Sequence, residues 1–361
     1  MEAHSFDVVV IAVGLAAAAA GALRLRALPP TAPPTGSIGV VIPARNEAAR
    51  LPHLLAALAS DRSLTETGAA VLVVDDGSTD GTGELAASMG AGILSLSGPP
   101  AGWTGKSWAC WNGAGALEAD LLVFLDADTV PDPGFVLDLA STAERSDGLA
   151  SVQPIHRTTR AYEVLSAPCN VAAVLGCGTG PVGGRRWLRR PMAFGPALAI
   201  PAARYRQVGG HAAVRAEIVE DLALARECHE AGIAGSTWVG SGISYRMYPE
   251  GLRSLLQGWT KNLAVGASAA PPARTALVFA WVTATLMLAP LPFQGAIGIA
   301  AYVVAAAVST ALLRAVGRFP WWAGFAAPAL AGGFVVLVVW SAARRALGRP
   351  STWRGRVVAS R

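Results

Sequence analysis

Long apolar stretches lie at both ends of this chain, and a mixed region separates them. Residues 6–23 contain one charged side chain, Asp7, and are long enough to cross a bilayer. A cleaved signal peptide is the alternative, but the preceding residues include Glu2 and no Lys or Arg. Three further apolar stretches follow near the other end: about 275–293, 295–313 and 321–341. The pattern predicts a transmembrane anchor over 1–26, two or three membrane spans over 266–343 and a basic tail over 344–361.

Short apolar runs alternate with helical patterns in the mixed region, residues 37–265. The runs at 39–42, 70–74 and 121–125 are typical of strands buried on both faces. Residues 51–58 carry apolar side chains at helical spacing, and a second helix is expected after the second run. This alternation predicts one α/β domain whose mostly parallel sheet is covered by helices. The proline-rich segment 27–36 predicts a linker without helix.

Polar clusters follow all three predicted strands. Asp126 and Asp128 come directly after the third run, and residues two apart in an extended chain point to the same side. Asp75 and Asp76 follow the second run, and the polar loop 43–47 follows the first. Because open α/β sheets bind ligands at the carboxyl ends of their strands, we expect these clusters to form one ligand site.

Two neighbouring carboxylates also suggest a metal. A lone pair such as Asp126 and Asp128 is more often a solvated turn, but the other two clusters favour a site. Hard oxygen ligands suit Mg²⁺ or Mn²⁺, which bind proteins through one or two carboxylates together with substrate phosphates. The expected cofactor is therefore one of these two ions.

Three other segments carry candidate chemistry. Lys106 lies in a glycine-containing segment that fails the phosphate-loop pattern, because Pro100 stands where that loop needs glycine; it is either a surface lysine or a diphosphate contact. Glu220 and Asp221 open a predicted helix, where they are either partners of the helix dipole or the source of a general base. Segment 257–261 is either an interfacial anchor or a donor contact.

Composition indicates the cellular compartment and the class of partner. The net charge is +5, and only Lys106 and Lys261 of the 29 basic residues are lysine. The arginines gather near the apolar segments, and the cluster 185–190 includes a tryptophan, which fits anionic headgroups rather than nucleic acid. The four cysteines show no C-x-x-C spacing, as expected for a domain in the reducing cytoplasm.

The motifs occur in a consistent order that resembles membrane-anchored family 2 glycosyltransferases, which have a nucleotide-sugar-binding α/β fold. They are Val41-Ile-Pro-Ala-Arg-Asn-Glu47, Asp75-Asp-Gly-Ser-Thr-Asp-Gly-Thr82, Asp126-Ala-Asp128 and Glu220-Asp221. Gly102-Trp-Thr-Gly-Lys-Ser-Trp108 and Thr352-Trp-Arg-Gly-Arg356 further resemble a branch with carotenoid-acid (diaponeurosporenoate) glucosyltransferases and hopanoid-associated glycosyltransferases.

The resemblance implies a role for each motif residue. Asp126 would lie near the ribose, Asp128 would bind the metal on the diphosphate, and Asp221, beside Glu220, would be the general base. Processive members carry Gln-x-x-Arg-Trp, whereas Gln257-Gly-Trp-Thr-Lys261 stands here, which favours transfer of a single sugar. The residues expected to bind the donor are Pro43, Arg45, Glu47, Asp75, Asp76, Lys106, Asp126, Gln257, Trp259 and Lys261.

The expected protein is a multi-pass enzyme of the cell membrane with a cytoplasmic catalytic domain over 37–265. It would invert the anomeric centre while moving one sugar from a nucleotide-diphosphate sugar to a membrane-borne carotenoid, hopanoid or other isoprenoid lipid. A polyprenyl-phosphate sugar synthase, a nucleotidyltransferase and a non-catalytic membrane scaffold stay open as alternatives. Three C-terminal spans would place the arginine-rich tail outside, against the positive-inside rule. A cytoplasmic tail requires one irregular segment, and Pro290 and Pro292 favour 275–293.

Overall fold

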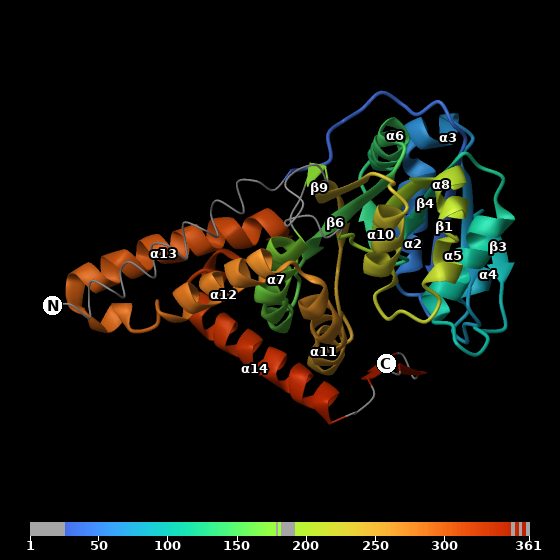
Figure 1. The fold of residues 1–361 in the computed structure, drawn as a ribbon. Helices are drawn as coiled ribbons and strands as arrows, with labels where there is room; N and C mark the ends of the chain where they lie inside the picture. The colour runs from blue at the N-terminus through green and yellow to red at the C-terminus, as the bar shows by residue number, and fades with distance from the viewer. Residues whose placement is uncertain (1–25, 178–179, 182–191, 348–350, 354–355, 359–361) are drawn as a thin grey trace.

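A computed structural model describes residues 26–177, 180–181, 192–347, 351–353 and 356–358. One side of the molecule is a sheet covered by helices, and the other holds the long apolar helices, with α7 (Ala167–Cys177) between them (Figure 1). The expected anchor lies outside the described residues except for Arg26, and the basic cluster 185–190 lies wholly outside them.

The first half of the sheet is parallel, as its strand–helix alternation predicts. β1 (Ile38–Ala44) lies between β2 (Ala70–Asp75) and β4 (Leu121–Leu125), and β3 (Gly92–Ser95) extends the edge beyond β2. Alternate β1 residues enter two separate apolar cores, because neighbouring side chains on a strand point to opposite faces. The helices connecting these strands are α2 (Leu51–Ser60), α3 (Arg62–Glu66), α4 (Thr82–Ser88) and α5 (Gly105–Ala116).

The second half of the sheet is mixed, so the expectation of a mostly parallel sheet holds only in part. β8 (Ala197–Pro201) runs antiparallel between β4 and β6 (Leu149–Arg157). β9 (Gly235–Tyr245) pairs parallel with β6 and antiparallel with β5 (Thr129–Pro131). The helices of this half are α6 (Phe135–Ser146), α8 (Ala202–Gln207), α9 (Gly210–Ala213) and α10 (Glu220–Glu230).

The C-terminal apolar stretches form helices. Helices α11 (Leu252–Ala269), α12 (Pro272–Leu286), α13 (Gly295–Val316) and α14 (Ala327–Ala346) follow β9. Three segments of the described chain are long and apolar enough to cross a membrane: Pro272–Phe293, Gly295–Val316 and Ala327–Ala346. Large apolar side chains such as Phe293 and Ile297 are almost fully exposed, as lipid-facing residues would be.

Direct contacts join the membrane helices and the linker to the sheet. β10 (Gly317–Arg318), between α13 and α14, pairs parallel with β6, and the buried Phe319 ring lies 5.5 Å from the His156 ring. The linker follows α6, since the Thr31 N–H donates to Asp138 Oδ1 over 2.7 Å. The predicted linker therefore has no helix but is attached to the domain surface.

Candidate active site

The loops after β1 and β2 are tied together at the carboxyl edge of the sheet. Arg45 Nη1 donates to the Asp76 carbonyl oxygen over 2.9 Å and lies 3.7 Å from the carboxylate of the same residue. Asn46 adopts a left-handed conformation (φ 53°), and its side-chain oxygen accepts the Thr79 N–H over 2.9 Å. Two of the three predicted clusters therefore form one surface.

Asp76 is the most buried carboxylate of this surface, only 3% exposed. Burial raises its pKa to about 6, and the adjacent Asp75 adds to the rise while Arg45 opposes it. The Asp75 carboxylate accepts the Ser78 N–H over 2.9 Å, which closes the turn leading to α4. The turn therefore brings the buried Asp76 carboxylate and the half-buried Asp75 carboxylate side by side.

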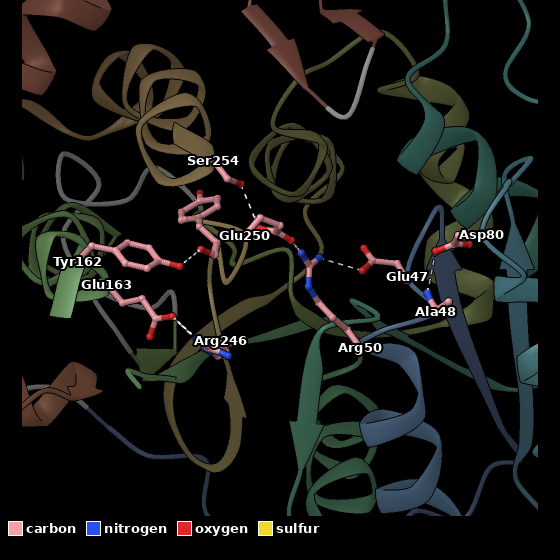
Figure 2. Close-up of polar contacts among 10 residues, drawn as sticks. Glu47, Ala48, Arg50, Asp80, Tyr162, Glu163, Arg246, Glu250 and Ser254 are labelled. Carbon is pink, nitrogen blue, oxygen red and sulfur yellow. Dashed lines mark hydrogen bonds and ion pairs between the residues drawn. The ribbon is translucent and has the colours of Figure 1, made fainter. Parts of the chain in front are cut away.

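Glu47 links this surface to the membrane side of the molecule. Its N–H donates to Thr82 Oγ1 over 2.9 Å, and its carboxylate pairs with Arg50 Nη1 over 2.9 Å. Arg50 also pairs with Glu250, and Glu250 accepts the Ser254 hydroxyl at the start of α11, as Figure 2 shows. The first predicted donor loop is thus in contact with the segment that leads into the membrane helices.

Lys106, on the first turn of α5, joins the third cluster to the acidic start of α10. Its Nζ lies 2.7 Å from Asp126 Oδ1 and 2.9 Å from Glu220 Oε1. It also lies 3.4 Å from the Gly195 carbonyl oxygen. Burial opposes the charged form of Lys106, but Asp126 and Glu220 outweigh it and hold the ammonium pKa well above its usual value. The cluster is therefore a cation among carboxylates.

Asp221 lies beside this cluster. A Cβ added to Gly195 would lie 2.9 Å from Asp221 Oδ2 and 3.1 Å from Lys106 Nζ, so the three groups are closely packed. Burial raises the pKa of Asp221 to about 7 and Glu220 adds to the rise, while Lys106 lowers it. A carboxylate that titrates near neutral pH is suited to accept a proton from a hydroxyl.

Asp128 lies two residues after Asp126, in the turn that follows β4. Both the N–H and the hydroxyl of Thr129 donate to the Asp126 carbonyl oxygen, over 3.0 and 2.8 Å, and this fixes the turn carrying the two carboxylates. Asp128 is half-buried near Tyr245, whose phenol pKa is raised by burial first and by the Asp128 charge second. Within the described ranges, no three His, Cys, Asp or Glu side chains gather closely enough to hold a metal by themselves.

The segment 257–261, which the sequence predicts to contact the donor, lies on α11. Trp259 is buried in the core shared with the membrane helices, where its indole N–H donates to Ser166 Oγ over 2.9 Å. Its ring packs edge-on against Tyr248, with centroids 6.2 Å apart. Gln257 is exposed on α11, and the Lys261 side chain lies outside the described part. The surroundings of Trp259 are those of a core residue.

Gly195 and Tyr245 belong to the site, but no sequence motif marks either residue. Gly195 lies in the turn before β8, where only the dipeptide Gly195-Pro196 marks a turn. Tyr245 accepts Gln153 Nε2 over 2.6 Å and donates to Asn170 Oδ1 over 3.1 Å, in a buried network beside Asp128. These residues come from distant parts of the chain, and the fold alone brings them together.

The end of α7 connects Asp221 to the first membrane helix. Burial raises the pKa of the Cys177 thiol, and the nearby Asp221 adds to the rise while Arg274 opposes it, so both charges act on one side chain. Arg274, on the first turn of α12, donates to the Leu175 carbonyl oxygen over 3.4 Å. The end of α7 therefore lies beside the start of α12, where the apolar helices begin.

An α/β sheet that gathers acidic loops from β1, β2 and β4 at one edge, beside a helix opening with two carboxylates, defines a nucleotide-sugar-binding class of protein. The chain belongs to glycosyl transferase family 2, whose profile matches residues 39–221. The family expected from the order of the motifs is thus confirmed.

Two curated relatives match a similar part of the chain. It is 35% identical over 254 residues to the 4,4'-diaponeurosporenoate glycosyltransferase of Staphylococcus haemolyticus, covering 69% of this chain and 66% of the relative. It is 33% identical over 253 residues to the protein of that name from Staphylococcus aureus (strain USA300), covering 68% and 66%. The match spans just under two thirds of each relative's length.

A solved structure shares the overall fold. It is the mannosyltransferase PcManGT from Pyrobaculum calidifontis in complex with GDP-Man and Mn²⁺, with a TM-score of 0.55 and 16% identity. The similarity covers 93% of this chain and 98% of that chain, so it includes the apolar helices as well as the sheet.

Proposed function

We propose that this protein is an inverting glycosyltransferase that moves one sugar from a nucleotide-diphosphate sugar to a membrane-borne lipid. One observation carries the proposal: Asp221, a half-buried carboxylate whose pKa is raised to about 7, lies beside Lys106, which contacts the predicted donor carboxylate Asp126. A proton acceptor is thereby adjacent to a donor-binding edge, as an attack on the donor's anomeric carbon requires.

The donor side uses the three loops at the sheet edge. Pro43, Arg45 and Glu47, with Asp75 and Asp76, would hold the nucleoside, while Asp126 would face the ribose. Asp128 and Asp126 fit a Mg²⁺ or Mn²⁺ ion that takes its other ligands from the diphosphate and water, because the described residues offer no larger ligand set. When bound, the ion supplies positive charge to the departing diphosphate.

The chain's own residues would direct the transfer as follows. Asp221 takes the proton of the acceptor hydroxyl while the hydroxyl oxygen forms its bond to the anomeric carbon. The bond from that carbon to the diphosphate oxygen breaks, and the nucleoside diphosphate leaves with the electron pair. An acceptor carboxylate would need no deprotonation, and Asp221 would then contribute less to the rate.

Several observations support a lipid acceptor and the release of product after one transfer. The named relatives act on 4,4'-diaponeurosporenoate, a carotenoid acid by its name. Arg274, at the start of α12, donates to the Leu175 carbonyl oxygen near the end of α7, whose Cys177 thiol pKa is influenced by Asp221 as well as by Arg274. The Gln257–Lys261 segment also departs from the processive Gln-x-x-Arg-Trp pattern. The catalytic domain would lie on the cytoplasmic side of the cell membrane.

The test is a direct search for the product. The purified full-length protein is incubated with a panel of nucleotide sugars and a bacterial lipid extract, and products are read by mass spectrometry. We expect a lipid whose mass has grown by one sugar, together with free nucleoside diphosphate. Release of pyrophosphate would indicate a nucleotidyltransferase, and a water-soluble product or a ladder of sugar additions would contradict the proposal.

A further inference from the structure

The Lys106 ammonium is surrounded by oxygen atoms of the protein itself. An ammonium has three N–H donors, and three acceptors lie within reach: Asp126 Oδ1 at 2.7 Å, Glu220 Oε1 at 2.9 Å and the Gly195 carbonyl oxygen at 3.4 Å. These acceptors lie at the end of β4, the start of α10 and the turn before β8. One side chain therefore bridges three elements that converge on the site.

The backbone that carries Lys106 is held rigidly. Thr104 caps α5 by accepting the Ser107 N–H over 3.2 Å, and the Thr104 N–H donates to the Arg215 carbonyl oxygen over 2.7 Å. Further along α5, a Cβ on Gly113 would lie 2.5 Å from Val41 Cγ1, so the helix packs directly on the sheet. The ammonium is thus presented from a fixed helix end.

We propose that Lys106 is a positioning residue that fixes the Gly195 turn and the start of α10, and hence Asp221, rather than a ligand of the donor diphosphate. The inference rests on the proposed function and differs from the diphosphate contact that the sequence suggested. Its ion pairs with Asp126 and Glu220 join α5 to the end of β4 and to the start of α10. Asp221, adjacent in sequence to Glu220, takes its place from this arrangement.

The two roles differ in what they do to nucleotide binding. A diphosphate ligand discriminates between a nucleoside diphosphate and the matching monophosphate, because a lysine contact to the second phosphate is present in only one of them. A positioning residue changes both affinities by the same factor or leaves both unchanged. It lowers kcat instead, since a misplacement of about 1 Å can cost roughly 10²-fold in rate.

The experiment compares the wild type with Lys106→Gln in the full-length protein. Dissociation constants for the pairs UMP/UDP and GMP/GDP are measured by calorimetry at fixed Mn²⁺, and the pair that binds the wild type more tightly is used. We expect the mono- to diphosphate affinity ratio of Lys106→Gln to stay within about 3-fold of the wild type while kcat falls about 10²-fold. The matched control is Arg204→Gln. It removes an exposed cation of α8 that pairs with Asp147, and it should change neither the affinity ratio nor kcat.

Loss of diphosphate affinity at least tenfold beyond that of the monophosphate would overturn the inference, as would an unchanged kcat. If Lys106→Gln does not fold, Lys106→Arg carries the test, because a planar guanidinium fork cannot match three acceptors placed around an ammonium. Lys106→Arg should lower kcat while the mono- to diphosphate affinity ratio stays unchanged. A changed ratio would overturn the inference. A wild type that binds neither nucleotide pair contradicts the proposed function itself.

Discussion

Asp221 is subject to opposing influences on its charge. Burial and the neighbouring Glu220 favour the protonated form, whereas Lys106 favours the carboxylate, and the resulting pKa is about 7. Only the carboxylate can accept a proton, so we expect kcat to rise with pH through about 7 and then level off. A pH–rate profile under saturating donor checks this, and a rate that falls through the same interval would contradict the base assignment.

Replacing this carboxylate separates chemistry from binding. Asp221→Asn keeps the shape of the side chain but removes the proton acceptor, and loss of a general base costs about 10²–10⁴-fold in rate. We expect transfer to a hydroxyl acceptor to slow by this factor while calorimetry finds nucleotide affinity unchanged. Lost donor affinity would instead give Asp221 a role in positioning the substrate.

Asp128 tests the metal in a way that is independent of the base. It is half-buried, lies within the Asp126–Thr129 turn and belongs to no larger group of possible metal ligands among the described residues. We expect Asp128→Ala to abolish transfer and to remove the Mn²⁺-dependent part of nucleotide binding, leaving the metal-free affinity unchanged. Turnover that resists both a chelator and this substitution would contradict metal dependence.

The donor-side residues could be predicted because each follows an apolar run that forms a parallel strand. Asp75 and Asp126 end up at one edge for that reason alone. Gly195 could not be predicted, since its importance comes from how close it lies to Asp221 and Lys106. Trp259 beside Lys261 resembles a donor or interface contact in sequence, yet its indole N–H is bonded to Ser166 in a buried core.

At the scale of elements, the turn before β8 packs closely against the site and limits where Asp221 can lie. A Cβ at Gly195 would lie 2.9 Å from Asp221 Oδ2, closer than real contacts allow, whereas a Cβ at Gly115 on α5 meets nothing within 4 Å. We expect Gly195→Ala to lower kcat about 10²-fold with near-normal thermal stability, because the turn must shift the base. Gly115→Ala should keep full activity, and equal activity of the two variants would contradict this reading of the turn.

Two glutamates shown in Figure 2 test which ionic contacts stabilise the fold. Glu163 is fully buried at the start of the 3-10 turn η1 (Ala161–Ser166) and accepts Arg246 Nη2 over 2.6 Å and the Thr159 N–H over 2.6 Å. Arg246 is 35% exposed, but removing the charge of the fully buried Glu163 disrupts this ion pair and its backbone hydrogen bonds, so Glu163→Gln should clearly lower the Tm. Glu250 pairs with Arg50 but is 48% exposed, and Glu250→Gln should cost less than about 1 kcal/mol. Thermal unfolding in detergent compares them, and equal shifts would be contrary to this expectation.

The strand direction in the second half of the sheet could not be predicted from the apolar runs. Residues 197–200 are buried like those of β4, but β8 runs antiparallel to β4. A run buried on both faces specifies a central strand without specifying its direction. The direction of the first four strands could be predicted, since each is linked to the next by a helical connection.

At the scale of the whole molecule, we expect the three apolar helices to differ in how they lie in the bilayer. α13 ends at β10, which pairs with the catalytic sheet, so its C-terminal end lies on the catalytic side. The chain then runs back along α13, since the Tyr302 hydroxyl contacts the Phe325 carbonyl oxygen. Tyr302 lies 14 residues before Val316, a depth of about 21 Å at 1.5 Å per residue, which is less than the roughly 30 Å hydrocarbon core.

From that depth α14 returns toward the catalytic side. Its Ser341 hydroxyl donates to the Thr260 carbonyl oxygen of α11 over 2.7 Å, and α11 begins directly after Glu250, the partner of Arg50 (Figures 1 and 2). We therefore expect segment 319–346 to form a re-entrant loop rather than a third crossing, although α14 is long and apolar enough to span a bilayer. Pro290 and Pro292, by contrast, lie in the turn that joins α12 to α13. This geometry removes the conflict between three apolar segments and an arginine-rich C-terminal side.

We therefore expect the end of α14 to lie on the same side of the membrane as the catalytic domain. Three single cysteines test this in cells with a membrane-impermeant maleimide: Leu347→Cys after α14, Gln294→Cys at the far turn and Glu66→Cys on α3, all at exposed positions. Leu347→Cys should react only after permeabilisation, as Glu66→Cys does, because an even number of crossings separates α11 from the tail. Labelling of Leu347→Cys in intact cells, together with protection of Glu66→Cys, would mean that α14 crosses the bilayer and that the re-entrant arrangement is wrong.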